Sequence, residues 1–351
     1  MKIVVTGATG NVGTRVVEAL AADPRVSEIV GLARRRPDWS PPKTRWVAAD
    51  VVSADLETHF AGAAAVIHLA WLIQPARDER ATYAVNVDGS RRVFRAAAAA
   101  GAGALVHASS VGAYSPGPKD RATDESWPTD GIPTSFYSRH KAEAERALDE
   151  VEVANPRLRV VRLRPGVVGQ RDAGTEIRRL FLGPFLPSAL VRPGLVRVVP
   201  DTPNLRIQVV HAADCAEAYR LAALSEVARG AYNVAADPVL DPDVLARVLG
   251  ARKVPVPARV LRAAASLTYR ARLQPTPPGW LDLGLGVPIM STERIRSELG
   301  WSPAHPATDV LLELMAGMRE SAGRPTPPLD PATSGPLRVR ELLTGVGRRN
   351  P

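Results

Sequence analysis

The chain has 351 residues, 45% of them hydrophobic, a formal net charge of +9 at pH 7 and a single cysteine, Cys215; this length allows one large domain with a smaller partner region. One cysteine excludes an intramolecular disulfide and a cysteine-rich metal site, and no apolar run approaches the roughly 20 residues that span a bilayer, so we expect a cytoplasmic protein without a membrane partner. The arginines are scattered and are not interleaved with aromatic residues, which argues against nucleic acid and favours small anionic partners.

The first predicted elements are a buried strand over residues 2–6, a glycine-rich turn and a helix from about residue 11 to 22. Glycines allow the sharp turn, the approach of backbone N–H groups to a pyrophosphate and close helix packing. The spacing Gly-x-x-Gly-x-x-Gly is one residue longer than the usual fingerprint, and an ordinary turn is the alternative. We predict a dinucleotide site formed by Gly7, Thr9, Gly10, Asn11, Val12 and Gly13.

The second predicted strand covers residues 28–33 and is followed by Arg34. In an NAD-binding protein, an acidic residue near this position would bind the ribose. Arg34, Arg35 and Arg36 follow without a carboxylate until Asp38. Because guanidinium groups favour a 2′-phosphate, we predict NADP over NAD, with NAD still possible. A solvated arginine run is the alternative interpretation.

The next predicted elements bring further candidate cofactor contacts. Residues 45–48 form a third strand that ends near the adenine, and residues 64–70 form a fourth strand with a small residue at its end. A long helix is predicted over residues 82–100. The candidates are Asp50, Val51, Leu69, Ala70 and Asn86. The six histidines show no ligand-pair spacing, so we predict no metal.

The candidate catalytic residues follow the fifth predicted strand, residues 105–108. Ser110 comes directly after that strand, and Tyr137 and Lys141 lie four residues apart on one face of a helix. We predict that Lys141, together with an oxidised nicotinamide, lowers the pKa of Tyr137 from its usual value of about 10. Ser110 would hold the substrate oxygen while Tyr137 moves a proton and hydride passes between the substrate and the nicotinamide.

The conjunction of these motifs resembles the extended short-chain dehydrogenase/reductase family, also called the NAD-dependent epimerase/dehydratase family. The similarity covers about residues 1–318 and is carried by residues 6–13, 109–114, 137 with 141, 163–169, 209–216 and 299–303. It implies an α/β fold, a Rossmann doubly wound parallel sheet with a smaller C-terminal substrate-binding lobe. It also adds Pro165 to the cofactor contacts and suggests a homodimer through two long helices. Gly166 and Val167 replace an asparagine that nucleotide-sugar members often carry.

The predicted domains are residues 1–170, the NAD(P)-binding part, and 171–320, a substrate lobe with elements that return to the Rossmann domain at about 207–235. Residues 208–211 are expected to rejoin the main sheet, ahead of a helix to Leu224 that buries Cys215. The proline-rich residues 321–351 are expected to be a disordered tail. Five lobe arginines are candidates for a substrate diphosphate, namely Arg178, Arg179, Arg192, Arg197 and Arg206.

Three functions remain open at this point. The first is an NAD(P)-dependent oxidoreductase that acts on a carbonyl or carbinol and exchanges its cofactor. The second is a nucleotide-sugar epimerase or dehydratase that retains NAD+. The third, from another class, is a regulatory protein that binds NADP without turnover. Ser110, Tyr137 and Lys141 serve the first two equally, so these residues do not separate them.

Overall fold

A seven-stranded sheet, all of whose pairings are parallel, forms the centre of the computed structural model, which describes residues 1–74, 76–183 and 187–334. The strand order is β11-β7-β5-β4-β1-β2-β3. The strands are β1 (Lys2–Thr6), β2 (Glu28–Ala33), β3 (Thr44–Ala48), β4 (Ala65–His68), β5 (Ala104–Ala108), β7 (Arg159–Pro165) and β11 (Gly230–Val234). This order reverses between β1 and β4, as in a doubly wound fold, and confirms the predicted fold class.

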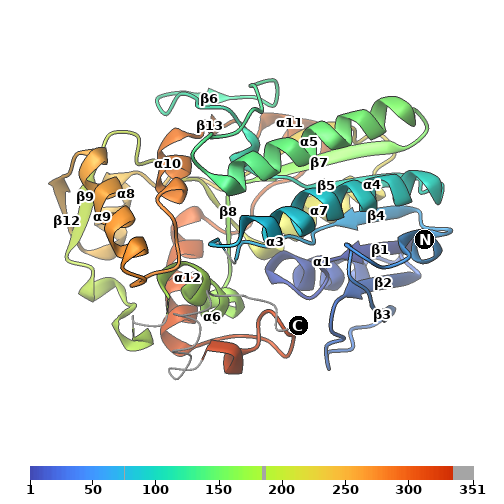
Figure 1. The fold of residues 1–351 in the computed structure, drawn as a ribbon, viewed down its shortest axis with the longest axis horizontal. Helices are drawn as coiled ribbons and strands as arrows, with labels where there is room; N and C mark the ends of the chain where they lie inside the picture. The colour runs from blue at the N-terminus through green and yellow to red at the C-terminus, as the bar shows by residue number, and fades with distance from the viewer. Residues whose placement is uncertain (75, 184–186, 335–351) are drawn as a thin grey trace.

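Helices cover both faces of the sheet. Alternate strand residues point to opposite sides, so Val5 packs with α1 (Asn11–Ala22) and α7 (Ala212–Leu224), whereas Val4 packs with the helices of the other face. Those helices are α2 (Leu56–Phe60), α4 (Ser90–Ala99) and α5 (Phe136–Ala154). Figure 1 shows α4 and α5 side by side along the sheet. Cys215 is fully buried in α7, as predicted.

The long helix predicted over residues 82–100 consists of three pieces. These are α3 (Glu79–Tyr83), a π-helical turn over Ala84–Gly89 and α4. The extra residue of a π turn rotates the helix face locally, and such turns are frequent at functional sites. Asn86 lies in this turn and is fully buried.

Most of the remaining elements form a lobe beside the carboxyl ends of the strands, whereas α11 (Glu293–Leu299) packs against β11 of the main sheet (Figure 1). Three two-stranded sheets pair β6 (Ala122–Thr123) with β13 (Ile289–Met290), β8 (Val167–Gly169) with β10 (Val209–His211), and β9 (Val198–Asp201) with β12 (Arg252–Pro255). The other helices are α6 (Gly174–Ile177), α8 (Pro242–Leu249), α9 (Ala258–Arg270), α10 (Gly279–Gly286) and α12 (Ala307–Glu320). Short 3-10 or π turns cover Val111–Ala113, Arg171–Ala173, Arg178–Leu182, Ser188–Leu190, Pro193–Leu195 and Pro331–Ser334.

The expectation that residues 208–211 rejoin the main sheet is wrong. They form β10, which pairs with β8, and β11 is the strand that returns to the sheet beside β7. The chain changes partner at Gly166, whose N–H donates to Val234 while the next N–H, that of Val167, donates to Gln208. A Cβ at residue 166 would lie 2.4 Å from the Gln208 oxygen, so glycine permits this close crossing.

The proline-rich segment after α12 packs on the Rossmann part over its described residues. Thr326 is 2% exposed, and its hydroxyl donates to the Thr9 carbonyl at 2.9 Å. Arg324 pairs with Glu18 of α1, and Leu329 is buried. The expected disorder is therefore wrong for residues 321–334, because polar bonds and one apolar anchor hold them; residues 335–351 lie outside the described part.

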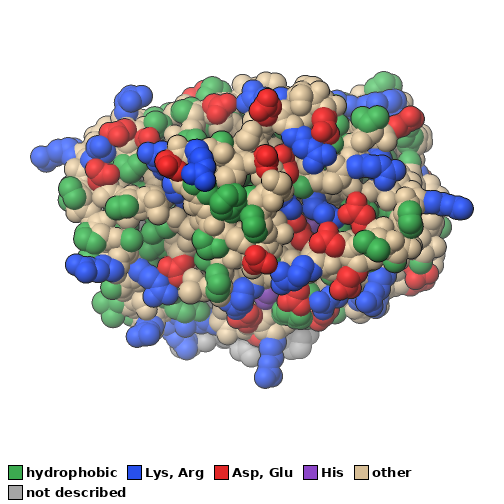
Figure 2. Space-filling view, turned by 90° about the horizontal axis from the view of Figure 1, so that it is seen from above, with side chains coloured by type: hydrophobic (Ala, Val, Ile, Leu, Met, Phe, Trp, Pro, Cys, Tyr) green, Lys and Arg blue, Asp and Glu red, His purple; other side chains and the backbone are tan. Residues whose placement is uncertain are grey.

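The charged groups are mixed over the surface. On the face drawn in Figure 2, Lys and Arg side chains are interspersed with Asp and Glu rather than gathered in one basic patch. Among the described residues, no helix is long and apolar enough to cross a membrane.

Candidate active site

The glycine-rich loop between β1 and α1 is closely packed at Gly7 and Gly13 and has free space at Gly10. Gly7 has φ +68°, and a Cβ there would lie 2.6 Å from the Ala70 nitrogen. At Gly13 a Cβ would lie 2.2 Å from the Gly7 oxygen, whereas at Gly10 nothing lies closer than 3.5 Å. Gly7 and Gly13 are thus required by the fold, and the open space is at Gly10. This cradle at the start of α1 fits the pyrophosphate of a dinucleotide.

The rest of the loop is tied to neighbouring elements. The Asn11 amide donates to the Val168 carbonyl at 3.1 Å and accepts from Gln170 at 2.9 Å. Thr9 is buried beneath the C-terminal segment, and Val12 is half-buried against the core. These bonds connect the loop to β8, which directly follows Pro165 and Gly166. The loop is therefore held by residues from the middle of the chain and by the segment that contains Thr326.

The predicted adenosine contacts lie beyond the ends of β2 and β3. The Gly7 N–H donates to Leu32 at 3.2 Å, which brings the glycine-rich loop beside the strand end that carries the exposed Arg34. Asp50 accepts from the Val52 N–H at 3.1 Å, and Val51 is 6% exposed. The three candidates thus lie at the strand edge where a parallel sheet binds its ligands.

The candidates after β4 support the site in different ways. Leu69 donates to Thr6 at 3.0 Å, and Ala70 packs on Gly7. Asn86 is bonded through both amide atoms to the backbone of Leu72, at 2.7 and 2.8 Å. In this structure Asn86 therefore holds the loop that carries Trp71.

The structure brings Ser110, Tyr137 and Lys141 together at the end of β5. Tyr137 lies close enough to Ser110 for that hydroxyl to influence its pKa, and the Ser110 oxygen accepts from the Gly112 N–H at 3.0 Å. Lys141 donates to the Ala108 carbonyl at 2.6 Å and lies 5.8 Å from the centre of the Tyr137 ring. The side chains of Ser110, Tyr137 and Lys141 thus lie close together at the end of β5.

Burial shifts the pKa values of two of these groups. It raises the pKa of Tyr137 to about 12, and Ser110 lowers it only in part. Burial also holds the pKa of Lys141 well below its usual value, although Glu145 opposes that shift. Lys141 is engaged by the Ala108 carbonyl and by the Trp71 ring, 3.4 Å from its ammonium. The lowering of the Tyr137 pKa by Lys141 and an oxidised nicotinamide stays a prediction.

A buried polar network below these residues was not predicted. Ser109 bonds Glu145, which forms a 2.6 Å ion pair with Arg164. Arg164 also donates to the Tyr114 hydroxyl at 3.0 Å. Burial raises the pKa of Glu145, but the bond and charge of Arg164, the bond from Ser109 and the charge of Arg162 together outweigh it, so the net shift is downward. Glu145 lies four residues after Lys141 on the same helix, and this spacing was the available signal.

An aromatic cluster on the lobe side was also missed. Trp71 meets Tyr137 edge to face at 5.9 Å, and Trp280 packs on Tyr137 at 4.7 Å between ring centres. Phe181 meets Trp280 edge to face at 5.0 Å. No spacing in the sequence connects these residues, because loops bring them together from distant positions.

The five lobe arginines that were candidates for a substrate diphosphate differ in their exposure and contacts. Arg206 donates to the Lys119 carbonyl at 2.9 Å, and Arg192 and Arg197 are exposed. Arg178 is 9% exposed, and Arg179 is half-buried. No group of three or more metal-ligating side chains occurs in the described ranges.

Three comparisons relate the chain to known proteins. It is 28% identical over 325 residues to an uncharacterized protein of Mycobacterium tuberculosis, covering 92% of this chain but only 31% of that relative's length. It is 30% identical over 325 residues to the 3-diazoavenalumate denitrifying reductase of a Streptomyces species, covering 88% of this chain and 97% of the relative.

The fold agrees with solved structures. The UDP-glucose 4-epimerase of Thermus thermophilus, solved with NAD, superposes with a TM-score of 0.66 at 23% identity and covers 91% of this chain and 99% of its own. Residues 3–235 match the NAD dependent epimerase/dehydratase family. This match includes the glycine-rich loop, Ser110, Tyr137 and Lys141, so the chain belongs to the NAD-dependent epimerase/dehydratase family.

Proposed function

We propose that this protein is an NADP-dependent reductase that converts a carbonyl group of a small substrate to a carbinol. The observation that supports the proposal most directly is the placement of Ser110, Tyr137 and Lys141 together at the end of β5, next to an open glycine-rich cradle. Residues 1–170 would supply the cofactor site and these three side chains. Residues 171–320 would supply most of the substrate lobe.

Each side chain has one role in this proposal. Ser110 donates a hydrogen bond to the carbonyl oxygen and orients it. Tyr137, which is protonated at neutral pH because its pKa is about 12, gives its proton to that oxygen. Lys141 lies beside the tyrosine, and in its protonated form it would stabilise the phenolate that remains when the proton leaves. A nicotinamide cofactor held by the glycine-rich loop would supply the hydride chemistry that this reduction needs.

Residues of the Rossmann part would hold the cofactor. The loop from Gly7 to Gly13 fits its pyrophosphate, and Asp50 and Val51 would border the adenine. Arg34, exposed beyond β2, would bind a 2′-phosphate. Leu69, Ala70 and Pro165 would line the nicotinamide side.

Reduction is favoured over epimerisation by one specific comparison. The relative whose length is matched almost completely, at 30% identity, is named as a reductase. The lobe residue Trp280 and the Rossmann residue Trp71 also place aromatic rings against Tyr137. We further propose a cytoplasmic homodimer assembled through α4 and α5, which light scattering on the purified protein would test.

Binding of NADPH and NADH to the purified protein, titrated separately, tests this function. We expect exchangeable binding that favours NADPH, and oxidation of NADPH when a carbonyl substrate is added. Arg34→Ser should weaken NADPH binding about tenfold, since a bond to a charged group is lost, and leave NADH binding unchanged. Arg45→Ser, on the neighbouring strand, is the control. NAD+ that co-purifies with the protein and is released when the protein is denatured would instead indicate an epimerase or dehydratase. Cofactor binding without turnover would indicate a regulatory protein.

A further inference from the structure

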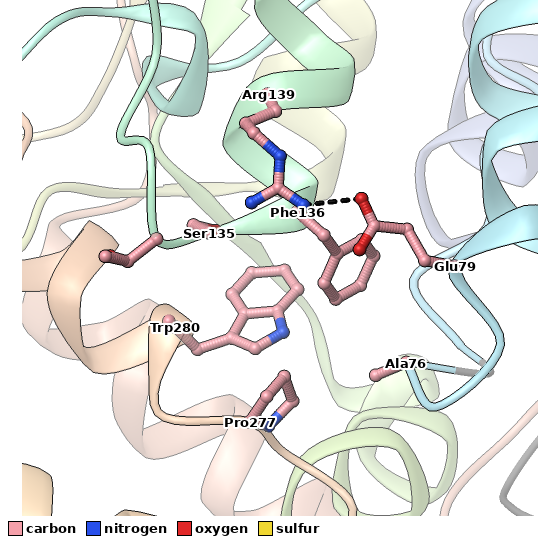
Figure 3. A pocket seen from close by; sticks show the side chains of 9 residues that line it. Ala76, Glu79, Ser135, Phe136, Arg139, Pro277 and Trp280 are labelled. Atoms are coloured by element: carbon pink, nitrogen blue, oxygen red, sulfur yellow. Dashed lines mark hydrogen bonds and ion pairs between the residues drawn. The ribbon is translucent and has the colours of Figure 1, made fainter.

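A cavity lies beside the candidate active site, between the start of α5, α3 and the start of α10. Its volume is about 150 Å³, and its lining includes Ala76, Phe136, Pro277 and Trp280 (Figure 3). Glu79, Thr134, Ser135 and Arg139 line it as well, so its lining is mixed rather than apolar. Its volume is about that of a cavity that holds one benzene-sized ring. Its position makes it a neighbour of Tyr137, which directly follows Phe136 on α5.

One indole ring connects the cavity to Tyr137. Trp280 lines the cavity, and the same ring packs on Tyr137 with ring centres 4.7 Å apart and an interplanar angle of 36°. Phe136 meets Trp280 edge to face at 6.4 Å, and Phe181 does so at 5.0 Å. Edge-to-face and offset arrangements are the favourable ones for aromatic pairs. Phe136 and Trp280 therefore give the cavity an aromatic wall.

The indole N–H of Trp280 is buried, and no described residue accepts a hydrogen bond from it. The same is true of Trp71, on the other side of Tyr137. Buried donors are normally paired, and an unpaired one is costly. A ligand with an oxygen acceptor near its ring would pair with such a donor.

The charges at the cavity rim neutralise each other. Arg139 forms an ion pair with Glu79, drawn as the dashed line in Figure 3, and donates to the Pro133 carbonyl at 2.8 Å. Both charged residues line the cavity. A diphosphate would need positive charge that is not already paired, so the rim suits an uncharged group.

From these observations we propose that the cavity binds an aromatic ring of the substrate and that Trp280 selects it, so that the substrate class is uncharged ketones that carry an aryl ring on a short alkyl chain. This inference rests on the proposed reductase function. The reaction takes one hydride and one proton and yields an aryl-substituted carbinol and oxidised cofactor. Trp280 acts here as a specificity-determining residue, whereas the proton still comes from Tyr137.

A matched pair of ketones tests the proposal. 4-Phenylbutan-2-one and 4-cyclohexylbutan-2-one carry the same carbonyl group and differ only in whether the ring is aromatic. With the full-length protein and NADPH, we expect kcat/KM about tenfold higher for the phenyl compound, the size of effect that one aromatic contact supplies. Trp280→Leu should bring the ratio close to one, and Trp280→Phe should keep most of it. Trp127→Phe, another buried indole without a described partner, should change nothing.

Calorimetric binding of both ketones separates the inference from the proposed function. Selective binding of the phenyl compound that Trp280→Leu abolishes, without NADPH oxidation, would support the cavity and refute the reductase. Equal reduction of both ketones, or a preference that Trp280→Leu leaves intact, would support the reductase and overturn the cavity assignment. Absence of both binding and reduction would overturn both.

Discussion

Tyr137 is bounded by two regions of opposite character. On one side, Ser110 lies beside it, and the ion pair of Glu145 and Arg164 lies buried further below. On the other, Trp71 from the loop after β4 and Trp280 from α10 pack on it with aromatic surface. The difference suggests that the polar side chains set the chemistry and the aromatic side chains set the substrate.

The largest expected effect comes from the residue that both regions share. Tyr137→Phe removes the hydroxyl and keeps the aromatic packing, so kcat should fall about 10²–10⁴-fold, the range for loss of a general acid. The Kd for NADPH should stay within about twofold. Tyr83→Phe, which removes a hydroxyl bonded to Glu143 on the outer side of the helix pair, is the control. An unchanged kcat in the Tyr137 variant would remove this residue from the mechanism.

Glu145→Gln tests the polar region. It leaves Arg164 charged and without its carboxylate in a site where both side chains are at most 5% exposed. Loss of one partner of a buried pair costs about 3–5 kcal/mol, which urea unfolding would measure. Glu28→Gln, which breaks the exposed pair with Arg45, should cost less than about 1 kcal/mol. Equal costs for the two variants would show that the buried network is not specially important.

Lys119 is a buried polar group inside the lobe, and it makes the free energy of unfolding depend on pH. It is 7% exposed and donates to the carbonyls of Arg206 and Gly284, and burial lowers its pKa to about 8. Between about pH 8 and the unfolded pKa of about 10.4, the unfolded chain binds more protons than the folded chain. The contribution of Lys119 to the free energy of unfolding therefore rises with pH across that window, by up to about 3 kcal/mol.

Urea unfolding at pH 7.5 and pH 10.5 would measure this rise. The increase from the lower to the higher pH should be smaller in Lys119→Met than in the parent protein. Lys2→Met, at the start of β1, should leave the increase unchanged. The same increase in all three proteins would contradict the assignment.

The smallest expected effect concerns the cofactor cradle. Gly10→Ala meets nothing closer than 3.5 Å, so the fold should keep its Tm, while the added methyl group should weaken NADPH binding about tenfold. Gly13→Ala would place a Cβ 2.2 Å from the Gly7 oxygen and should lower the Tm itself. Gly284→Ala is the control, because a Cβ at that residue would have no neighbouring atom within 4 Å. Unchanged affinity in Gly10→Ala would place the pyrophosphate elsewhere.

The sequence predicts the sheet side of this molecule far better than the lobe. Strands, the glycine-rich turn and the spacing of Tyr137 and Lys141 are local patterns, so residues 28–33 were predicted with the bounds that β2 has. Trp71 and Trp280 lie 209 positions apart and meet Tyr137 only through loop geometry. The partner of β10 was also wrong, because a three-residue strand carries no information about which neighbour it pairs with.

The bond between Thr326 and Thr9 joins residues 317 positions apart. During translation at about 5–20 residues per second, the glycine-rich loop leaves the ribosome roughly 15–60 seconds before the segment that covers it. The cradle is thus the first part of the site to be synthesised and among the last to be completed. A nascent chain that binds its nucleotide early does so with a loop that still lacks its bond to Thr326.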